Sequence, residues 1–184
     1  MPTSKSTAKK ANRRPAKKAA RAATPSYLGL LNAIAVAETA AEPLFTAWAD
    51  KTDDAELEKT LRFVGMREGE HGKAFAKRML ELGYEVREPA VPGPDPELLK
   101  IAGSRRSDLR KFSDLGFGRG QADSDVFDNM FNDKNIDPIT GGLLGRYIAE
   151  ERDSVRRLSA DHQRISDAAQ KKKKPAKKKP AKKN

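Results

Sequence analysis

MREGEHGKAF, residues Met66 to Phe75, places two glutamates and a histidine in the middle of an apolar helical pattern. On either side, apolar residues recur in steps of three, four and their sums: Leu57, Leu61, Val64, Phe75, Met79 and Leu82. These steps are the spacing of one helix face. Continued across the gap, they place Glu68 and His71 toward the core and Glu70 toward water. An ionised carboxylate buried alone is costly, so Glu68 requires a cation, a hydrogen-bond network or a raised pKa.

Two further helical patterns each carry one glutamate on the core face. Glu38 lies in the first pattern, which follows Pro25 and runs Leu30, Leu31, Ile34, Ala37, Ala41, Leu44, Phe45 and Trp48. Glu151 fills a vacancy in the last pattern, which runs Leu144, Ile148, Val155, Leu158 and Ile165. His162 fills the other vacancy about 16 Å further along the helix, so we interpret it as a histidine at the edge of the core. Three helices therefore each present a carboxylate to the interior, and Glu68 with His71 can reach one ion from a single turn.

Glu38 in AVAETAAEP and Glu68 with His71 in MREGEHGKAF carry a family resemblance. With them, residues 26–84 resemble the first helical hairpin of the ferritin-like superfamily, particularly its rubrerythrin-like members. The resemblance implies an all-α fold, an antiparallel four-helix bundle that binds metal between its helices. It implies Glu38, Glu68, His71 and Glu151 as metal ligands. The cofactor it implies is iron, with manganese and zinc also suited to carboxylate and imidazole.

The second metal position of that family lacks ligands in this chain. Ser154 stands three residues after Glu151, where the family has a histidine, and no glutamate occurs between Glu97 and Glu150. Asp108 is the only acid of the third helix that the pattern places inward. We therefore expect each chain to bind about one ion. The residues support metal binding and not catalytic turnover. Two alternatives stay open: an oxidoreductase of the rubrerythrin-like di-iron type with a degenerate second position, and a metal-free structural bundle with a buried hydrogen-bonded cluster.

The middle of the chain is rich in helix breakers. VREPAVPGPDPELL predicts an extended crossover that ends near Pro96, followed by a third helix over residues 96–115 that is weakened at Gly103. The glycine-rich stretch GFGRGQADSD is interpreted as a loop. A short helix that covers one end of the core is predicted at Val126, Phe127, Met130 and Phe131. Pro43 is expected to kink the first helix without ending it.

Both ends of the chain are basic and contain no acid. Residues 1–25 hold eight Lys or Arg and residues 171–184 hold nine, whereas residues 26–170 hold twenty basic and 26 acidic residues. The net charge of +11 therefore belongs to the ends, and the middle is acidic. We expect one folded domain over residues 26–170 between two disordered tails.

The tails resemble the lysine-, alanine- and proline-rich tails of linker histones and bacterial nucleoid proteins. Flexible cations beside a polyphosphate release condensed counterions, so we expect DNA or RNA binding without sequence preference. This predicts a cytoplasmic, nucleoid-associated protein. A solubilising tail without a partner stays an alternative, as does an organellar transit peptide at the N-terminus. The expected nucleic-acid contacts are Lys9, Lys10, Arg13, Arg14, Lys17, Lys18, Lys171, Lys172, Lys173, Lys174, Lys177, Lys178 and Lys179.

Composition also excludes several classes of site. The chain has no cysteine, which excludes disulfides, thiolate–zinc sites and cysteine-ligated iron–sulfur clusters. We find no apolar stretch long enough to span a membrane and no hydrophobic signal core, so no membrane partner is expected. The oligomeric state is left open, a homo-oligomer included.

Overall fold

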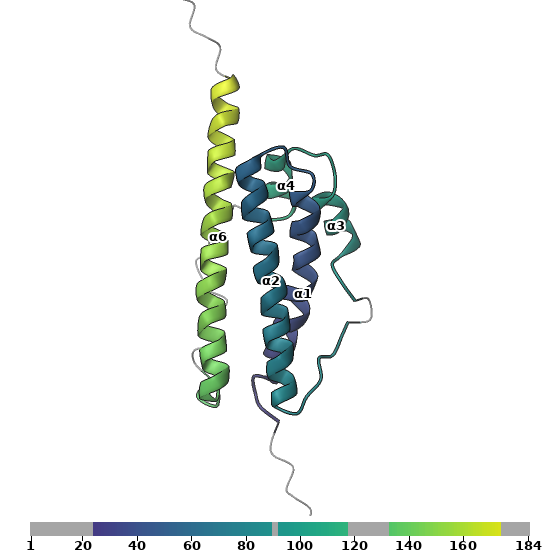
Figure 1. The fold of residues 1–184 in the computed structure, drawn as a ribbon, viewed down its shortest axis with the longest axis vertical. Helices are drawn as coiled ribbons and strands as arrows, with labels where there is room; N and C mark the ends of the chain where they lie inside the picture. Colours follow the sequence, from purple (N-terminus) through teal and green to yellow (C-terminus); the bar gives the residue numbers. More distant parts are fainter. Residues whose placement is uncertain (1–23, 90–91, 118–132, 174–184) are drawn as a thin grey trace, which may run out of the picture.

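The computed structural model describes residues 24–89, 92–117 and 133–173, and every regular element in these ranges is an α-helix. Three helices are long: α1 (Leu28–Ala49), α2 (Ala55–Glu81) and α6 (Pro138–Lys173). Two are short: α3 (Pro96–Ala102) and α4 (Asp108–Asp114). Figure 1 shows the long helices running along one axis, with α3 and α4 near the end of the molecule where α1 finishes. The predicted all-α class is confirmed.

The prediction of one third helix over residues 96–115 is wrong, because two short helices occupy that range. α3 ends at Ala102 with Gly103 as its C-cap, and α4 begins only after Ser107. Glycine is unfavourable inside a helix, and the Ser104 hydroxyl donates to the carbonyl oxygen of Ile101 at 2.7 Å, which competes with continued helix. The described ranges therefore hold three long helices, and the short helix expected at residues 126–131 lies outside them.

Local sequence signals explain the other helix boundaries. The carboxylate of Asp54 accepts a hydrogen bond from the backbone N–H of Leu57 at 2.9 Å and so caps the start of α2. Gly83 follows the end of α2 with a φ of +84°, a conformation that favours glycine. Pro96 takes the first position of α3, as predicted. α1 continues through Pro43 to Ala49, also as predicted.

Two apolar clusters hold the long helices together. The first, near the end of α1, contains Leu44, Phe45, Trp48, Leu57, Leu61, Val64, Phe112 and Leu158. The second, near the start of α1, contains Tyr27, Leu31, Ile34, Phe75, Met79, Leu144, Tyr147 and Ile148. On each long helix the predicted metal ligands fall between the residues of the two clusters. The candidate site therefore has apolar packing on both sides along the helix axis.

The inward face of α6 differs from the predicted stripe. Val155 was expected to be buried but is 39% exposed, whereas Ser154 and Asp161 are 2% and 8% exposed. Ser154 accepts a hydrogen bond from Arg67 at 3.1 Å, and Asp161 accepts one from Thr60 at 2.6 Å. Both polar side chains can face inward because each has a hydrogen-bond partner on α2. Apolar spacing alone assigns these inward positions to the next residue along the chain.

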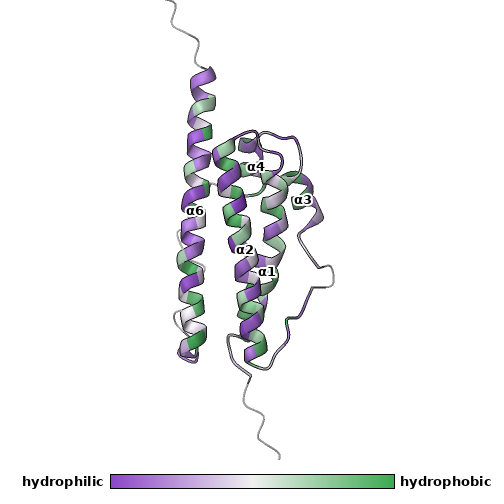
Figure 2. Ribbon diagram, in the orientation of Figure 1, coloured by the Kyte–Doolittle hydropathy of each residue, from purple (hydrophilic) through white to green (hydrophobic). Residues whose placement is uncertain are grey.

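The expectation that no stretch is apolar enough to span a membrane is also corrected. α1 is long and apolar enough by length and composition alone, and Figure 2 shows hydrophobic residues along much of it. Core helices pass the same test, and α1 carries the buried carboxylate of Glu38 and packs along α2. The observation is therefore weak evidence for a membrane segment.

Close packing of α1 on α2 depends on a glycine at the site. A Cβ atom at Gly72 would lie 2.9 Å from the backbone nitrogen of Thr39 and 3.2 Å from its Cα atom. These are backbone atoms of α1, so they cannot move away without shifting the helix that carries Glu38.

We expect Gly72→Ala to lower the free energy of unfolding by about 1–3 kcal/mol, the usual effect of overpacking. The matched control is Gly145→Ala in α6, because a Cβ there meets nothing within 4 Å. That variant should gain about 0.5–1 kcal/mol from helix propensity. Urea unfolding of both variants checks the pair, and a stabilised Gly72→Ala would contradict the close approach of α1 and α2.

Candidate metal centre

Four acidic or imidazole side chains from three helices meet between the two apolar clusters. Glu38 comes from α1, Glu68 and His71 from α2, and Glu151 from α6. One potential ligand atom of each lies within 4.8 Å of the others. The first three residues are buried and Glu151 is half-buried. The structure thus brings together all four residues that the sequence predicts as ligands, and a buried group of this kind can hold a metal ion.

The imidazole of His71 has one ring nitrogen bonded outside the cluster and one facing it. Nε2 lies 2.7 Å from Oε2 of Glu150, whose Oε1 accepts a hydrogen bond from Arg146. Nδ1 lies 3.4 Å from Oε1 of Glu151 and 3.7 Å from Oε2 of Glu38. A proton on Nε2 that is donated to Glu150 leaves the Nδ1 lone pair available to an ion. Glu150 therefore fixes the orientation of the imidazole through a hydrogen bond to Nε2.

Three atoms of the cluster are buried without a hydrogen-bond partner: Oε2 of Glu38, Nδ1 of His71 and Oε1 of Glu151. Buried polar atoms are nearly always paired, so three unpaired atoms facing one point require an explanation. All three can accept but, with His71 neutral, none can donate. One cation among them would satisfy them together, so the donor set fits a divalent metal ion.

Tyr147 fixes the carboxylate of Glu38. Its hydroxyl donates to Oε1 of Glu38 at 2.7 Å, and its ring meets the edges of His71 and Phe75 at centroid distances of 5.0 and 5.2 Å. This contact leaves Oε2 of Glu38 directed at the cluster. Sequence reasoning missed both Tyr147 and Glu150. The available signal was their position relative to Glu151: Tyr147 lies one helical turn before it, and Glu150 directly precedes it.

Without an ion, the cluster retains protons. Burial, the neighbouring Glu38 and the charge of Glu151 raise the pKa of Glu68 to about 10. Burial alone would lower the pKa of His71, but the carboxylates of Glu151, Glu38 and Glu150 outweigh it and raise the pKa to about 10. Burial opposes ionisation of Glu38, yet the polar hydrogens of the neighbouring His71 and Glu68 and the hydroxyl of Tyr147 lower its pKa. A metal ion must therefore displace protons when it binds.

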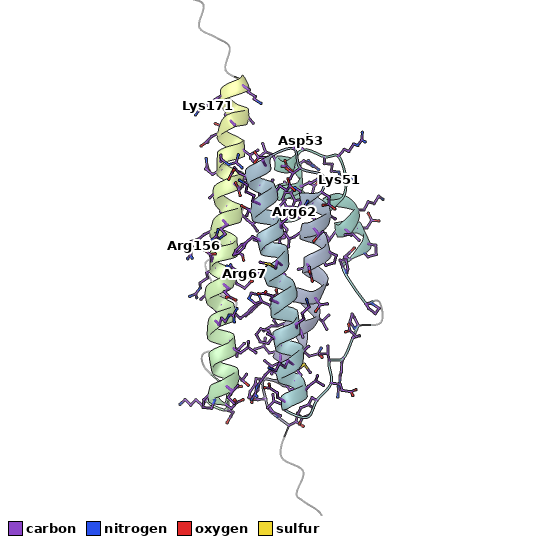
Figure 3. All side chains as sticks on the ribbon, in the orientation of Figure 1. Lys51, Asp53, Arg62, Arg67, Arg156 and Lys171 are labelled. Atoms are coloured by element: carbon purple, nitrogen blue, oxygen red, sulfur yellow. The ribbon has the colours of Figure 1, made fainter. Side chains whose placement is uncertain are left out.

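The space next to Ser154 is occupied by an arginine. Nη1 of Arg67 donates to Oγ of Ser154 at 3.1 Å, to the carbonyl oxygen of Glu150 at 2.7 Å and to Oδ2 of Asp153 at 3.2 Å. Figure 3 shows Arg67 between α2 and α6. A guanidinium has five donors and no acceptor, so it cannot be a metal ligand. Ser154, three residues after Glu151, therefore hydrogen-bonds to a protein cation.

Asp108, predicted as the only inward acid of the third helix, lies elsewhere. Its two carboxylate oxygens accept hydrogen bonds from Nε1 of Trp48 at 2.7 Å and from Oγ1 of Thr52 at 2.8 Å. Trp48 is ten residues beyond Glu38 on α1, about 15 Å along the helix. Asp108 therefore ties α4 to the end of α1 and is not part of the cluster.

The remaining predicted residues are not part of the cluster. His162 is half-buried with its ring 4.9 Å from that of Phe112, which agrees with a histidine at the edge of the core. Of the predicted nucleic-acid contacts, Lys171, Lys172 and Lys173 belong to α6, three residues beyond the boundary expected from composition. The others lie outside the described residues.

A cleft of about 250 Å³ between α2 and α6 reaches the outer side of His71. Its lining residues are Glu70, His71, Ala74, Leu143, Arg146, Tyr147 and Glu150. The cleft meets Glu150, which binds Nε2, so the imidazole stands between the cleft and the carboxylates on its Nδ1 side. The cleft is therefore lined by both partners of the contact between His71 and Glu150.

Comparisons of the chain with protein-family models, with curated proteins and with solved structures give no match. The ferritin-like resemblance therefore rests on the residues of the site themselves.

The raised pKa values predict the pH dependence of the chelated, metal-free protein. The pKa values of folded Glu68 and His71 lie above their ordinary values of 4.5 and 6.5, so the folded protein binds more protons than the unfolded chain. The stability from Glu68 is complete below pH 4.5 and that from His71 below pH 6.5, and both are lost as the pH rises toward about 10.

The unfolding free energy should therefore fall between pH 5 and about pH 9, more steeply above pH 6.5. Glu68→Gln, which carries no titrating proton, should give a shallower fall. Urea unfolding in a chelating buffer measures both slopes. A wild-type slope that equals that of Glu68→Gln would show that Glu68 does not hold a proton in the folded state.

Proposed function

We propose that the protein binds one divalent metal ion through Glu38, Glu68, Nδ1 of His71 and Glu151. The observation that carries the proposal is the set of three buried, unpartnered atoms that face one point. Three carboxylates and one imidazole suit iron, manganese or zinc. The three negative charges of the ionised carboxylates outnumber the two positive charges of a divalent ion. Any such ion would act there as a Lewis acid, and iron or manganese would add redox chemistry.

The order of the ligands supports a ferritin-like arrangement within this proposal. One glutamate comes from the first long helix, Glu-x-x-His from the second and one glutamate from the last. This is the order of the bundles that bind metal through carboxylates. The four-helix bundle itself stays a proposal, since three long helices are described.

Binding is better supported than turnover. Oxygen activation at two irons needs a second set of ligands, and Arg67 and Ser154 occupy the place where the resemblance puts one of them. A metal-free structural cluster is the other alternative. In it His71 is protonated on both ring nitrogens, and its Nδ1–H lies 3.4 Å from Oε1 of Glu151 and 3.7 Å from Oε2 of Glu38. These two contacts are longer than ordinary hydrogen bonds, whereas one bound ion would engage all three buried atoms.

The proposal includes a tether to nucleic acid through the basic ends of the chain, and with it a cytoplasmic, nucleoid-associated location. Its support is the separation of charge: seventeen Lys or Arg without an acid lie in residues 1–25 and 171–184, and the remainder is acidic. Cations of this kind bind phosphates by counterion release. The metal site and the tether would then be separate functions of one chain.

Metal binding should saturate at about one ion per chain in native mass spectrometry, because one ligand set is present. Glu68→Ala should abolish tight binding. Glu150→Ala should weaken binding about 10- to 100-fold, the usual effect of removing the partner that orients a histidine ligand. Glu70→Ala is the matched control, since Glu70 lines the same cleft but is exposed, and it should bind as the wild type does.

Two equivalents of tightly bound iron with a bridged di-iron spectrum would contradict this stoichiometry. Rapid peroxide consumption by the iron-loaded protein, lost in Glu68→Ala, would favour the oxidoreductase instead. Equal metal content in wild type and Glu68→Ala would leave the metal-free cluster as the better account.

Removing residues 1–23 together with 171–184 should abolish retention of duplex DNA, leave metal content unchanged and lower helicity only by the last three residues of α6. For the whole chain, affinity should fall steeply between low and physiological salt and differ little among sequences, since phosphate contacts carry no base information. Fluorescence anisotropy with labelled duplexes checks both statements. DNA binding by the doubly truncated protein at moderate salt would assign it to a folded basic face such as SRRSDLRK instead.

A further inference from the structure

The described chain begins and finishes at opposite ends of the molecule. Oγ of Ser26 donates to Asp133, and the hydroxyl of Tyr27 donates to Asp137, each at 2.7 Å, so the start of the described chain lies beside the start of α6. α6 then runs for 36 residues to Lys173, about 54 Å at 1.5 Å per residue. In Figure 1 the two ends of the described chain accordingly leave at opposite ends of the long axis.

The end of α6 also carries its lysines away from the rest of the fold. Arg164 pairs with Asp54 at 2.7 Å, and Asp54 caps the start of α2. The nine residues from there to Lys173 correspond to about 13 Å of helix beyond this contact. Lys171 and Lys172 are exposed on this projection, and Figure 3 places Lys171 there. The first cations of the C-terminal end are therefore held at a distance from the carboxylates of the body.

The surface between the two ends does not favour phosphate. Residues 26–170 hold more acids than bases, and several of their arginines are bound to carboxylates. Arg164 pairs with Asp54 and Asp161, and Arg157 pairs with Asp153. A duplex laid along this body would meet a net negative charge overall, although Arg146 and Arg156 of α6 are exposed.

We propose that one molecule holds two separate segments of double-stranded DNA, one at each end, and bridges them. The inference rests on the proposed binding of DNA by the tails and adds the geometry of the fold. With two duplexes, the cations at each end of the chain contact phosphates of their own duplex. Neither phosphate backbone then has to run along the acidic body. The helical body is then a spacer that sets the separation of the two duplexes.

The test uses the whole chain and two duplexes. One duplex is fixed to beads, a second is labelled and free, and labelled DNA recovered on the beads reports bridging at low salt. Anisotropy on the labelled duplex alone reports binding. Full-length protein should recover the labelled duplex, whereas residues 24–184 and residues 1–170 should each still bind one duplex, with recovery reduced about tenfold or more because one attachment point is gone.

The sharpest control keeps the charge and changes only its place. A chain in which residues 171–184 are moved ahead of Met1 has the same cations, all at one end. It should bind a single duplex as tightly as the full-length chain and lose most of the bridging. Equal bridging by this variant would overturn the proposal, as would bridging by residues 1–170, which would indicate self-association. Binding without bridging by the full-length chain would overturn it and leave the tether intact, whereas absence of binding would overturn the tether itself.

Discussion

Burial of two carboxylates and one imidazole, with a third carboxylate half-buried beside them, is the constraint on which the rest of the structure depends. Like charges within 5 Å of one another in a poorly polarisable interior repel strongly, so the cluster needs protons or a cation to exist. The ligands come from α1, α2 and α6, and whatever neutralises them also fixes how these helices pack. Apolar clusters on both sides keep water away, which strengthens every charge interaction inside. The same burial leaves acceptor atoms without donors, which is the condition that an ion can satisfy.

The side chains around the cluster fix the orientation of its potential ligand atoms. Tyr147 and Glu150 engage the outer atoms of Glu38 and His71 and leave the inner atoms free. On the side toward the end of α1, the guanidinium of Arg67 supplies a positive charge that cannot exchange or change oxidation state. A fixed protein cation therefore lies beside Ser154, three residues after Glu151 on α6.

Helical periodicity predicted the long helices and placed Glu38, Glu68, His71 and Glu151 on core faces, because a polar residue on a core face stands out against apolar neighbours. It failed where burial depends on a partner in another helix. Ser154 is buried because Arg67 reaches it, and Val155, the more apolar choice, is exposed. Glu150 escaped notice because its neighbour Glu151 already filled the inward position. The break after Gly103 depends on local hydrogen bonding that competes with the helix, which an apolar stripe does not reveal.

The central claim is that His71 and the carboxylates share a single ion, and X-ray absorption of the protein loaded with one equivalent of zinc tests it most directly. The account predicts nitrogen and oxygen ligands at about 2.0–2.2 Å, with scattering from one imidazole that disappears in His71→Ala. It also predicts no zinc–zinc scattering at about 3.5–4 Å when a second equivalent is added. Scattering from two imidazoles, from none, or from a metal pair would contradict it.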